Sequence, residues 1–360
     1  MNPKIFLLSI ATLLASFLHG CNLQQEEIIK NEPSPKVTAE TKGEPSRLEI
    51  AKKRKRIVCG VHGGIKGFSI RQENDRYSGI DVDICRAVAA ALFDDPEAVE
   101  YVNLGTNNRF SAVSVGNVDL LSRNTTWTLK RDSALTIDFA AIVFYDGQGV
   151  MVRKNSGIAK WEDLNNQSIC VTTGTTSELN LYDEMARRQL NYYPVKFLEY
   201  NNAFTAYQAG RCQGITFDRS QLFARKSVLE DSDRHIILDE VISKEPLGPV
   251  VIEGDSQWLE AVRWVVYATI EAEELGINSQ NLEEMKTSQN PRIKRFLGIE
   301  GDLGFTLGLA PDFAQRIVRH VGNYQEIYDR NLGENSKLQI PRGQNQLWKN
   351  GGLLYSPPFR

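Results

Sequence analysis

The chain has 360 residues, of which 41% are hydrophobic and 24% are charged, and its formal net charge is −3 at pH 7. This length exceeds the usual size of one hydrophobic core, so two domains are expected. The composition is typical of a globular protein, and the small negative charge argues against a nucleic-acid partner. We interpret the basic run from Lys52 to Arg56 as a solvated stretch, because it lies outside any apolar pattern.

The N-terminus has the pattern of an export signal, predicted over residues 1–20. Lys4 precedes an apolar run from Ile5 to Leu18, which is too short to span a bilayer but suits a secretory signal peptide. The run leads into His19-Gly20-Cys21, which resembles a bacterial lipobox apart from His19. We predict a periplasmic or extracytoplasmic location with a lipid anchor to a membrane at Cys21. Simple secretion is the alternative.

Residues 21–55 are rich in Glu, Lys, Gln, Ser and Pro and nearly free of aromatic residues. Such a segment cannot bury enough apolar surface to offset the cost of ordering it. We expect a flexible tether with a mean reach of roughly 30 Å by random-coil scaling. That reach would hold a folded domain clear of a membrane.

Four cysteines follow Cys21, and exported proteins meet oxidising conditions that favour disulfides. Cys59 and Cys85 lie in one segment of the chain, and Cys170 and Cys212 lie in another. Four cysteines allow three pairings, of which 59–85 with 170–212 is the natural expectation. Four buried free thiols are the alternative.

Strand-like and helix-like patterns alternate from residue 56 onward. This alternation predicts a parallel α/β sheet, whose ligands bind beyond the carboxyl ends of the strands. The glycine-rich loop after the first strand lacks the spacing of a phosphate-binding loop. We interpret Asp81 and Asp83 as helix-capping residues. The expected elements are strand 57–61, helix 84–93, strand 99–104, a helix from Arg109 and strand 118–121.

The pattern begins again after a β-like run over residues 139–152 that is broken at 146–149. A second crossing near residues 246–249 returns the chain to the first sheet. We therefore predict an α/β fold of two lobes joined by two crossover strands. Lobe 1 is expected at 56–146 plus 250–360 and lobe 2 at 147–249, and no chemistry is predicted for the tail after Gly276.

Polar side chains gather at strand ends in both predicted lobes. The stretch 123–132 follows a strand and offers Thr126 and Arg131, and a guanidinium fork with nearby donors suits a carboxylate. In lobe 2, Thr176 opens a helix and Asp218 ends a strand, which supplies further donors and an anion for an ammonium group. Together these four residues predict a site for an α-amino acid. Ordinary loop and capping roles are the alternatives.

Five segments of the chain resemble the solute-binding proteins of polar amino-acid ABC transporters, particularly the general L-amino-acid branch. The resemblance covers roughly residues 55–360. It implies a two-lobed fold of the periplasmic-binding-protein type with two crossover hinge strands. It also implies that the protein closes on a free L-amino acid and delivers it to a membrane permease, without a cofactor. Its second and fourth segments are the most specific. The segments are GIDVDICRAVA (79–89), LSRNTTWTLKRD (121–132), YDGQG (145–149), TGTTSELNL (173–181) and GRC (210–212).

The resemblance also implies roles for single residues. Arg131, Thr126 and Thr176 would hold the α-carboxylate, and Asp218 would take the α-ammonium with help from the backbone at Asn124. Three further positions would shape the side-chain subsite, although Ile65-Lys66 departs from the pattern that precedes the family's aromatic wall. These positions are Phe68 as the aromatic wall, with Thr106 and Asn107.

An enzyme of the same fold, such as a periplasmic dehydratase or lyase, is the main alternative, and a sensory amino-acid-binding protein is another. General acid–base chemistry would need a tuned carboxylate or imidazole in the cleft. His62 is the histidine near the predicted cleft, and Glu178 could act as a base, although a helix start already explains its position. No metal-ligand spacing and no nucleophile-elbow motif occur in the sequence. We expect a binding protein and not an enzyme.

Overall fold

The computed structural model describes residues 45–360, which contain two five-stranded sheets and two smaller ones. The predicted signal peptide, the lipid site at Cys21 and most of the predicted tether lie outside the described residues. No helix within residues 45–360 is long and apolar enough to cross a membrane.

The first sheet belongs to lobe 1 and has the strand order β5-β1-β6-β15-β7. Its first three strands are parallel, whereas β15 runs antiparallel to β6 and β7. A small antiparallel sheet of β2, β3 and β4 lies between β1 and the next helix in the chain. The strands are β1 (Ile57–Val61), β2 (Gly64–Ile65), β3 (Ser69–Arg71), β4 (Tyr77–Ser78), β5 (Val99–Asn103), β6 (Leu120–Leu121), β7 (Ile137–Phe139) and β15 (Val250–Ile252).

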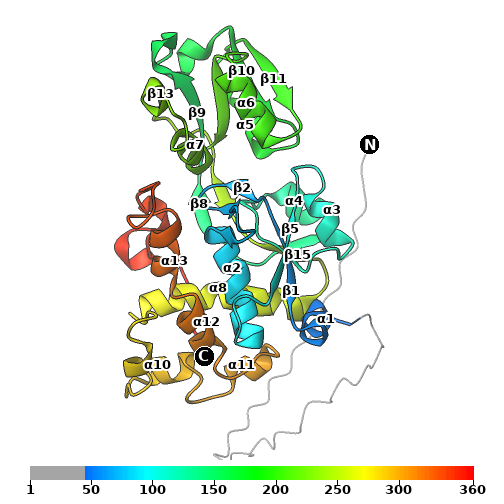
Figure 1. Ribbon diagram of the computed structural model, residues 1–360, viewed down its shortest axis with the longest axis vertical. Coiled ribbons are helices and arrows are strands. Elements are labelled where there is room, and N and C mark those ends of the chain that lie inside the picture. The colour runs from blue at the N-terminus through cyan, green and yellow to red at the C-terminus, as the bar shows by residue number, and fades with distance from the viewer. Residues whose placement is uncertain (1–44) are drawn as a thin grey trace, which may run out of the picture. The chain divides into compact units, whose positions relative to one another are not determined.

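Helices of lobe 1 cover this sheet, and α2 packs against α8, α12 and α13 (Figure 1). The run Ala87-Val88-Ala89-Ala90-Ala91 in α2 is fully buried, because small side chains let neighbouring helices approach on several sides. In α8, the buried Trp258 donates its indole N–H to the Asp119 carbonyl at 2.7 Å. The helices are α1 (Arg47–Arg54), α2 (Ile80–Phe93), α3 (Arg109–Ser114), α4 (Leu129–Ala134), α8 (Ser256–Glu274), α9 (Leu282–Met285), α10 (Pro291–Phe296), α11 (Leu303–Thr306), α12 (Phe313–His320) and α13 (Tyr324–Asn331).

The second sheet belongs to lobe 2 and has the order β11-β10-β12-β9-β13. Strand β10 is parallel to β11 and β12, and β9 is antiparallel to β12 and β13. Both lobes thus combine parallel strands with one antiparallel strand that directly follows a crossing between the lobes. This strand is β15 in lobe 1 and β9 in lobe 2. The elements are β9 (Gln148–Arg153), β10 (Gln167–Thr172), α5 (Thr176–Arg187), β11 (Tyr192–Phe197), α6 (Tyr200–Gln208), β12 (Gly214–Asp218), α7 (Arg219–Lys226) and β13 (His235–Ile237).

Two strands connect the lobes. β8 (Phe144–Asp146) carries the chain from lobe 1 to lobe 2, and β14 (Glu245–Leu247) carries it back. They pair with each other antiparallel, with Phe144 opposite Leu247, in a sheet of their own (Figure 1). We call this pair the hinge.

The prediction of a tether through residue 55 is wrong for its last ten residues. Ser46 caps α1 by accepting a hydrogen bond from the Leu48 N–H, and Leu48 and Ala51 are buried three residues apart on the face toward lobe 1. The basic run is not simply solvated either, because Arg54 forms an ion pair with the buried Asp119. Two buried apolar residues, a helix cap at Ser46 and an ion pair at Arg54 thus fasten this end of a polar segment to lobe 1.

The tail of the chain packs against the hinge. The side-chain amide of Asn345 accepts a hydrogen bond from the Tyr145 N–H at 2.7 Å and donates to the Tyr145 carbonyl at 3.0 Å, as a paired strand would. Arg342 anchors the same segment through a bidentate, partly buried ion pair with Glu273 at 2.8 and 3.1 Å. We call residues 340–355 the C-terminal strap.

The structure confirms both predicted disulfides, Cys59–Cys85 in lobe 1 and Cys170–Cys212 in lobe 2. The first ties β1 to α2, and the second ties β10 to the turn before β12. Each bond therefore fastens a central strand to a neighbouring element of its own lobe.

Replacing Cys170 and Cys212 together by serine should lower the free energy of unfolding by about 2–4 kcal/mol, because the unfolded chain regains the entropy of a closed loop. Urea denaturation followed by circular dichroism measures this difference. The matched control is the wild-type protein with and without a reductant. Identical unfolding midpoints for the wild type and the double variant under oxidising conditions would contradict a stabilising bond.

Candidate functional site

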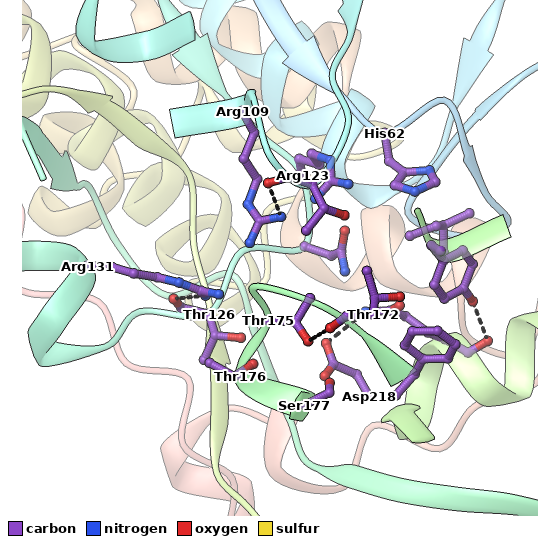
Figure 2. A pocket seen from close by; sticks show the side chains of 16 residues that line it. His62, Arg109, Arg123, Thr126, Arg131, Thr172, Thr175, Thr176, Ser177 and Asp218 are labelled. Atoms are coloured by element: carbon purple, nitrogen blue, oxygen red, sulfur yellow. Dashed lines mark hydrogen bonds between the residues drawn. The ribbon is translucent and has the colours of Figure 1, made fainter. Parts of the chain in front are cut away.

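A pocket lies between the two lobes, and each lobe supplies half of its lining (Figure 2). The lining is polar at its centre and aromatic at one side. His62 of lobe 1 also meets Tyr200 of lobe 2 edge to face, with ring centroids 5.6 Å apart. The lining residues are His62, Ile65, Thr106, Arg109, Arg123, Asn124, Thr126 and Arg131 from lobe 1, with Thr172, Thr175, Thr176, Ser177, Tyr200, Phe217, Asp218 and Gln221 from lobe 2.

Six of the seven predicted ligand-binding residues line this pocket: Arg131, Thr126, Asn124, Thr176, Asp218 and Thr106. The exception is Phe68, whose ring is 1% exposed and packs edge to face on Phe144 at 5.4 Å, inside the core of lobe 1. The aromatic side of the pocket comes instead from Tyr200 and Phe217 of lobe 2, whose rings lie 4.4 Å apart. Asn107 is exposed and does not line the pocket.

Arg131 reaches the pocket from the first turn of α4. Thr128 caps this helix by accepting a hydrogen bond from the Arg131 N–H, and the guanidinium donates to the Thr126 carbonyl at 2.8 Å. The guanidinium also lies over the Phe110 ring, 5.4 Å from its centroid. Burial lowers the pKa of Arg131, while Glu245 and Asp218 act in the opposite direction. These contacts fix a cation whose remaining donors face the pocket (Figure 2).

Thr126 and Thr176 meet at a buried carboxylate behind the pocket. Both hydroxyls donate to the same oxygen of Glu245, at 2.6 Å from Thr126 and 2.9 Å from Thr176. The other oxygen accepts from Ser243 at 2.6 Å and from Asn180 at 2.7 Å. Glu245 lies on hinge strand β14 and is 1% exposed. It therefore links lobe 1, lobe 2 and the hinge.

The N-terminus of α5 faces the same pocket. Thr175 caps this helix by accepting a hydrogen bond from the Glu178 N–H at 3.2 Å. The first backbone N–H groups of a helix have no partner within the helix, and its dipole places partial positive charge there. Thr176 and Ser177 thus carry amides suited to an anion.

Asp218 ends β12 and is 4% exposed. It accepts a hydrogen bond from the Gln221 side chain at 2.9 Å, and it makes no side-chain capping bond to α7. Burial, followed by the nearby carboxylates Asp146 and Glu245, raises its pKa well above the usual value for aspartate. A cation near this carboxyl would offset the cost of ionising it.

The capping role predicted for Asp81 and Asp83 is wrong. Gly79 is the N-cap of α2, and no side chain caps that end. Asp81 instead accepts from the Asn124 N–H at 3.2 and 3.3 Å, which fixes the loop that forms the pocket floor, and burial raises its pKa to about 7. Asp83 pairs with Arg330 of α13 at 2.8 Å. Both carboxylates thus bind partners in other elements of lobe 1.

Of the two residues considered for catalysis, His62 lines the pocket and Glu178 does not. Burial, followed by Arg123, Arg225 and Arg109, lowers the pKa of His62 well below its usual value, so the imidazole is neutral at pH 7. Glu178 pairs with Lys196 at 2.8 Å and does not line the pocket. Within residues 45–360, no group of three or more His, Cys, Asp or Glu side chains is placed to hold a metal ion.

The sequence profile of the bacterial extracellular solute-binding proteins, family 3, matches residues 57–287. The chain belongs to this family. It is 48% identical over 306 residues to the general L-amino acid-binding periplasmic protein AapJ of Rhizobium johnstonii, covering 84% of this chain and 90% of that protein. It is 45% identical over 316 residues to the glutamate/glutamine/aspartate/asparagine-binding protein BztA of Rhodobacter capsulatus, covering 88% and 94%.

A solved structure is similar to this family member over nearly all of the described chain. It is the ABC transporter periplasmic binding protein of Brucella ovis with glutathione bound, with a TM-score of 0.86 and 46% identity, covering 88% of this chain and all of that one. The predicted two-lobed fold is confirmed by this similarity together with the two separate sheets.

Sequence reasoning missed three charged residues of the site. Arg109 and Arg123 were assigned only to a helix start and a loop, yet both line the pocket. Both follow strands of the first sheet, so their position at strand carboxyl ends was a usable signal. No sequence pattern indicated Glu245. It lies on hinge strand β14, 119 residues from Thr126 in the chain, and only the fold brings the two side chains together.

We expect the Asp81→Asn variant to have a flatter dependence of stability on pH than the wild type. In the unfolded state Asp81 has the ordinary aspartate pKa of 3.8, whereas burial in the folded state raises its pKa to about 7. Between these values the folded state binds the extra proton, so the free energy of unfolding falls as pH rises, by at most about 1.4 kcal/mol per pH unit. Urea titrations from pH 4 to 8 measure the difference, and parallel wild-type and variant profiles would contradict it.

Proposed function

We propose that this protein binds a free L-amino acid between its lobes and delivers it to the membrane permease of an ABC transporter. The observation that carries the proposal is the pairing of opposite charges across one pocket. Arg131 and the amides at the start of α5 suit an α-carboxylate, and the buried Asp218 suits an α-ammonium group. The names of AapJ and BztA support this ligand class.

The transport role follows from the family and its relatives. A protein of Escherichia coli K12 that is 44% identical over 314 residues, covering 87% of this chain and 92% of that protein, is named a putative amino-acid ABC transporter-binding protein, YhdW. We extend the permease partner and the extracytoplasmic location to this chain on that basis. Lipid attachment at Cys21 stays a prediction, which mass spectrometry of the purified exported protein would test.

Binding without turnover distinguishes this proposal from an enzyme of the same fold. A buried carboxyl with a raised pKa, such as Asp218, is also what a general acid would need. Calorimetric titration against the twenty amino acids should show saturable binding, and chromatography should recover every bound ligand unchanged. Chemical conversion of a ligand would support the enzyme, and binding of none would refute the amino-acid site.

The Arg131→Ala variant should bind its best amino acid at least tenfold more weakly, because a charge-assisted hydrogen bond is worth on the order of 1.5–3 kcal/mol. Lys130→Ala is the matched control, since it removes an adjacent positive charge from an exposed position. Titration calorimetry compares the two. Equal affinities for both variants would remove Arg131 from the site.

Affinity should weaken as the pH falls from 8 to 5. Asp218 must be ionised to pair with an ammonium group, and its raised pKa brings protonation to a higher pH than for an ordinary aspartate. The α-groups of the ligand keep their charges over this range. The Asp218→Asn variant should bind at least tenfold more weakly at pH 8 and show a shallower pH profile. A profile as steep as that of the wild type would assign the titration to another group.

A further inference from the structure

Asp218 is the N-cap residue of α7, yet its side chain does not cap the helix. An aspartate in this position usually accepts a hydrogen bond from a backbone N–H of the first helical turn. The Asp218 carboxylate instead accepts from the Gln221 side chain at 2.9 Å and lines the pocket between the lobes (Figure 2). The open N–H groups of α7 therefore need a partner from another part of the chain.

The partner is the end of hinge strand β8, Asp146, together with Gly147 after it. The Gly147 carbonyl accepts a hydrogen bond from the Arg219 N–H at 2.8 Å. One carboxylate oxygen of Asp146 accepts from the Ser220 N–H at 3.5 Å, and the other accepts from the Ser220 hydroxyl. Arg219 and Ser220 are the first two residues of α7. The hinge thus caps this helix from a position 74 residues away in the chain.

Asp146 lies directly opposite Glu245 in the antiparallel pair of β8 and β14. Glu245 accepts hydrogen bonds from Thr126 and Thr176, next to the groups proposed for the ligand's α-carboxylate. Asp146 holds the start of α7, next to the group proposed for the α-ammonium. Two facing residues of the hinge therefore hold the two halves of the site.

The charge of Asp146 also acts on Asp218. Burial is the first cause of the raised pKa of Asp218, and the negative charge of Asp146 is the second. Burial raises the pKa of Asp146 itself to about 6, and its hydrogen bonds from Ser220 and Gly147 act in the opposite direction. Asp146 is therefore ionised at pH 8. Its charge keeps a proton on Asp218 up to a higher pH in the absence of a cation.

Charged and titratable side chains surround Asp146 on several elements. They are Lys244 and Glu245 of the returning chain, Asp218 at the end of β12, Arg219 of α7, Tyr328 of α13 and Arg342 of the C-terminal strap. Arg219 donates to two backbone carbonyls of lobe 2, and Arg342 pairs with Glu273. Lys244 is exposed. Within residues 45–360, Asp146 is thus held by hydrogen bonds rather than by an ion pair.

We propose that Asp146 is a positioning residue for the ammonium half of the site: it caps α7 from the hinge and thereby leaves the Asp218 carboxylate to the ligand. This inference rests on the proposed function, in which Asp218 binds the α-ammonium group. Without Asp146, the Asp218 side chain would serve the N–H groups of α7 and turn away from the pocket. The cap also joins the ammonium half of the site to a strand that connects the lobes.

Two substitutions separate the hydrogen bonds of Asp146 from its charge. Asp146→Asn keeps an acceptor oxygen for Ser220 and removes the charge, whereas Asp146→Ala removes both. Titration calorimetry from pH 5 to 8, with whichever of the twenty L-amino acids binds best, measures both effects. At pH 8 the Ala variant should bind about tenfold more weakly, because the helix loses its cap, and the Asn variant should lose less. In both variants the pH at which affinity falls should decrease by on the order of one unit.

Asp183→Asn is the matched control, because it removes an exposed carboxylate from α5 of the same lobe. It should leave the affinity and the pH profile as in the wild type. Hydrogen exchange reports the cap without any ligand: the Ser220 amide should exchange faster in Asp146→Ala than in the wild type, with Asp146→Asn between them. Thermal unfolding shows whether each variant is folded. If the Ala variant is not, the profile of the Asn variant decides.

The outcomes separate this inference from the proposed function. Wild-type affinity and pH profile in Asp146→Ala would overturn the positioning role and leave the amino-acid site intact. Equal losses in the Asn and Ala variants, without a change in the pH profile, would overturn it by assigning Asp146 to the hinge alone. A wild type that binds no amino acid would refute the proposed function. Exchange at Ser220 that depends on Asp146 would then retain the cap, and exchange that does not would overturn it.

Discussion

The carboxylate of Glu245 is the interaction on which the arrangement of the site depends. It accepts hydrogen bonds from Thr126 of lobe 1 and Thr176 of lobe 2 while lying on hinge strand β14. Hydrogen bonds to a buried charge contribute roughly 1.5–3 kcal/mol each, and losing one leaves the charge uncompensated. The loop before α4 and the start of α5 are therefore held at a common point. Because Arg131 and the α5 amides lie on these two segments, one hinge residue sets their separation.

The same contacts change how the threonines can act. A hydroxyl has one proton, and in both Thr126 and Thr176 that proton is directed at Glu245. In this conformation the donors available to a ligand carboxylate are the Arg131 guanidinium and the backbone amides at the start of α5. Hydroxyl oxygens remain able to accept a hydrogen bond, which suits an ammonium group better than a carboxylate. The threonines are thus placed to orient the charged groups around the pocket.

The alternation of strands and helices, both disulfides and six pocket residues could be predicted from sequence, because each depends on local pattern or on the rule that ligands meet strand ends. The predictions that were wrong concern residues whose surroundings depend on contacts between distant parts of the chain. Phe68 and Thr106 both lie in loops at the same side of the sheet, and only packing decides that Phe68 turns inward onto Phe144. Asp81 resembled a cap, yet its partner is the Asn124 N–H, 43 residues away. Helix α1 was not predicted, because its mostly polar composition is similar to that of the segment before it.

The C-terminal strap bears on how the hinge can move. The Asn345 side chain forms hydrogen bonds with both the N–H and the carbonyl of Tyr145 in β8. Arg342 links the strap to α8 through its ion pair with Glu273. The middle of β8 is therefore held as part of lobe 1. At the next residue, Asp146 accepts a hydrogen bond from Ser220 of lobe 2. Hinge motions are absorbed by a few backbone torsions, and on this strand we expect them between Tyr145 and Gln148. Because β14 carries Glu245 opposite this point, we expect rotation there to change the separation of Thr126 and Thr176.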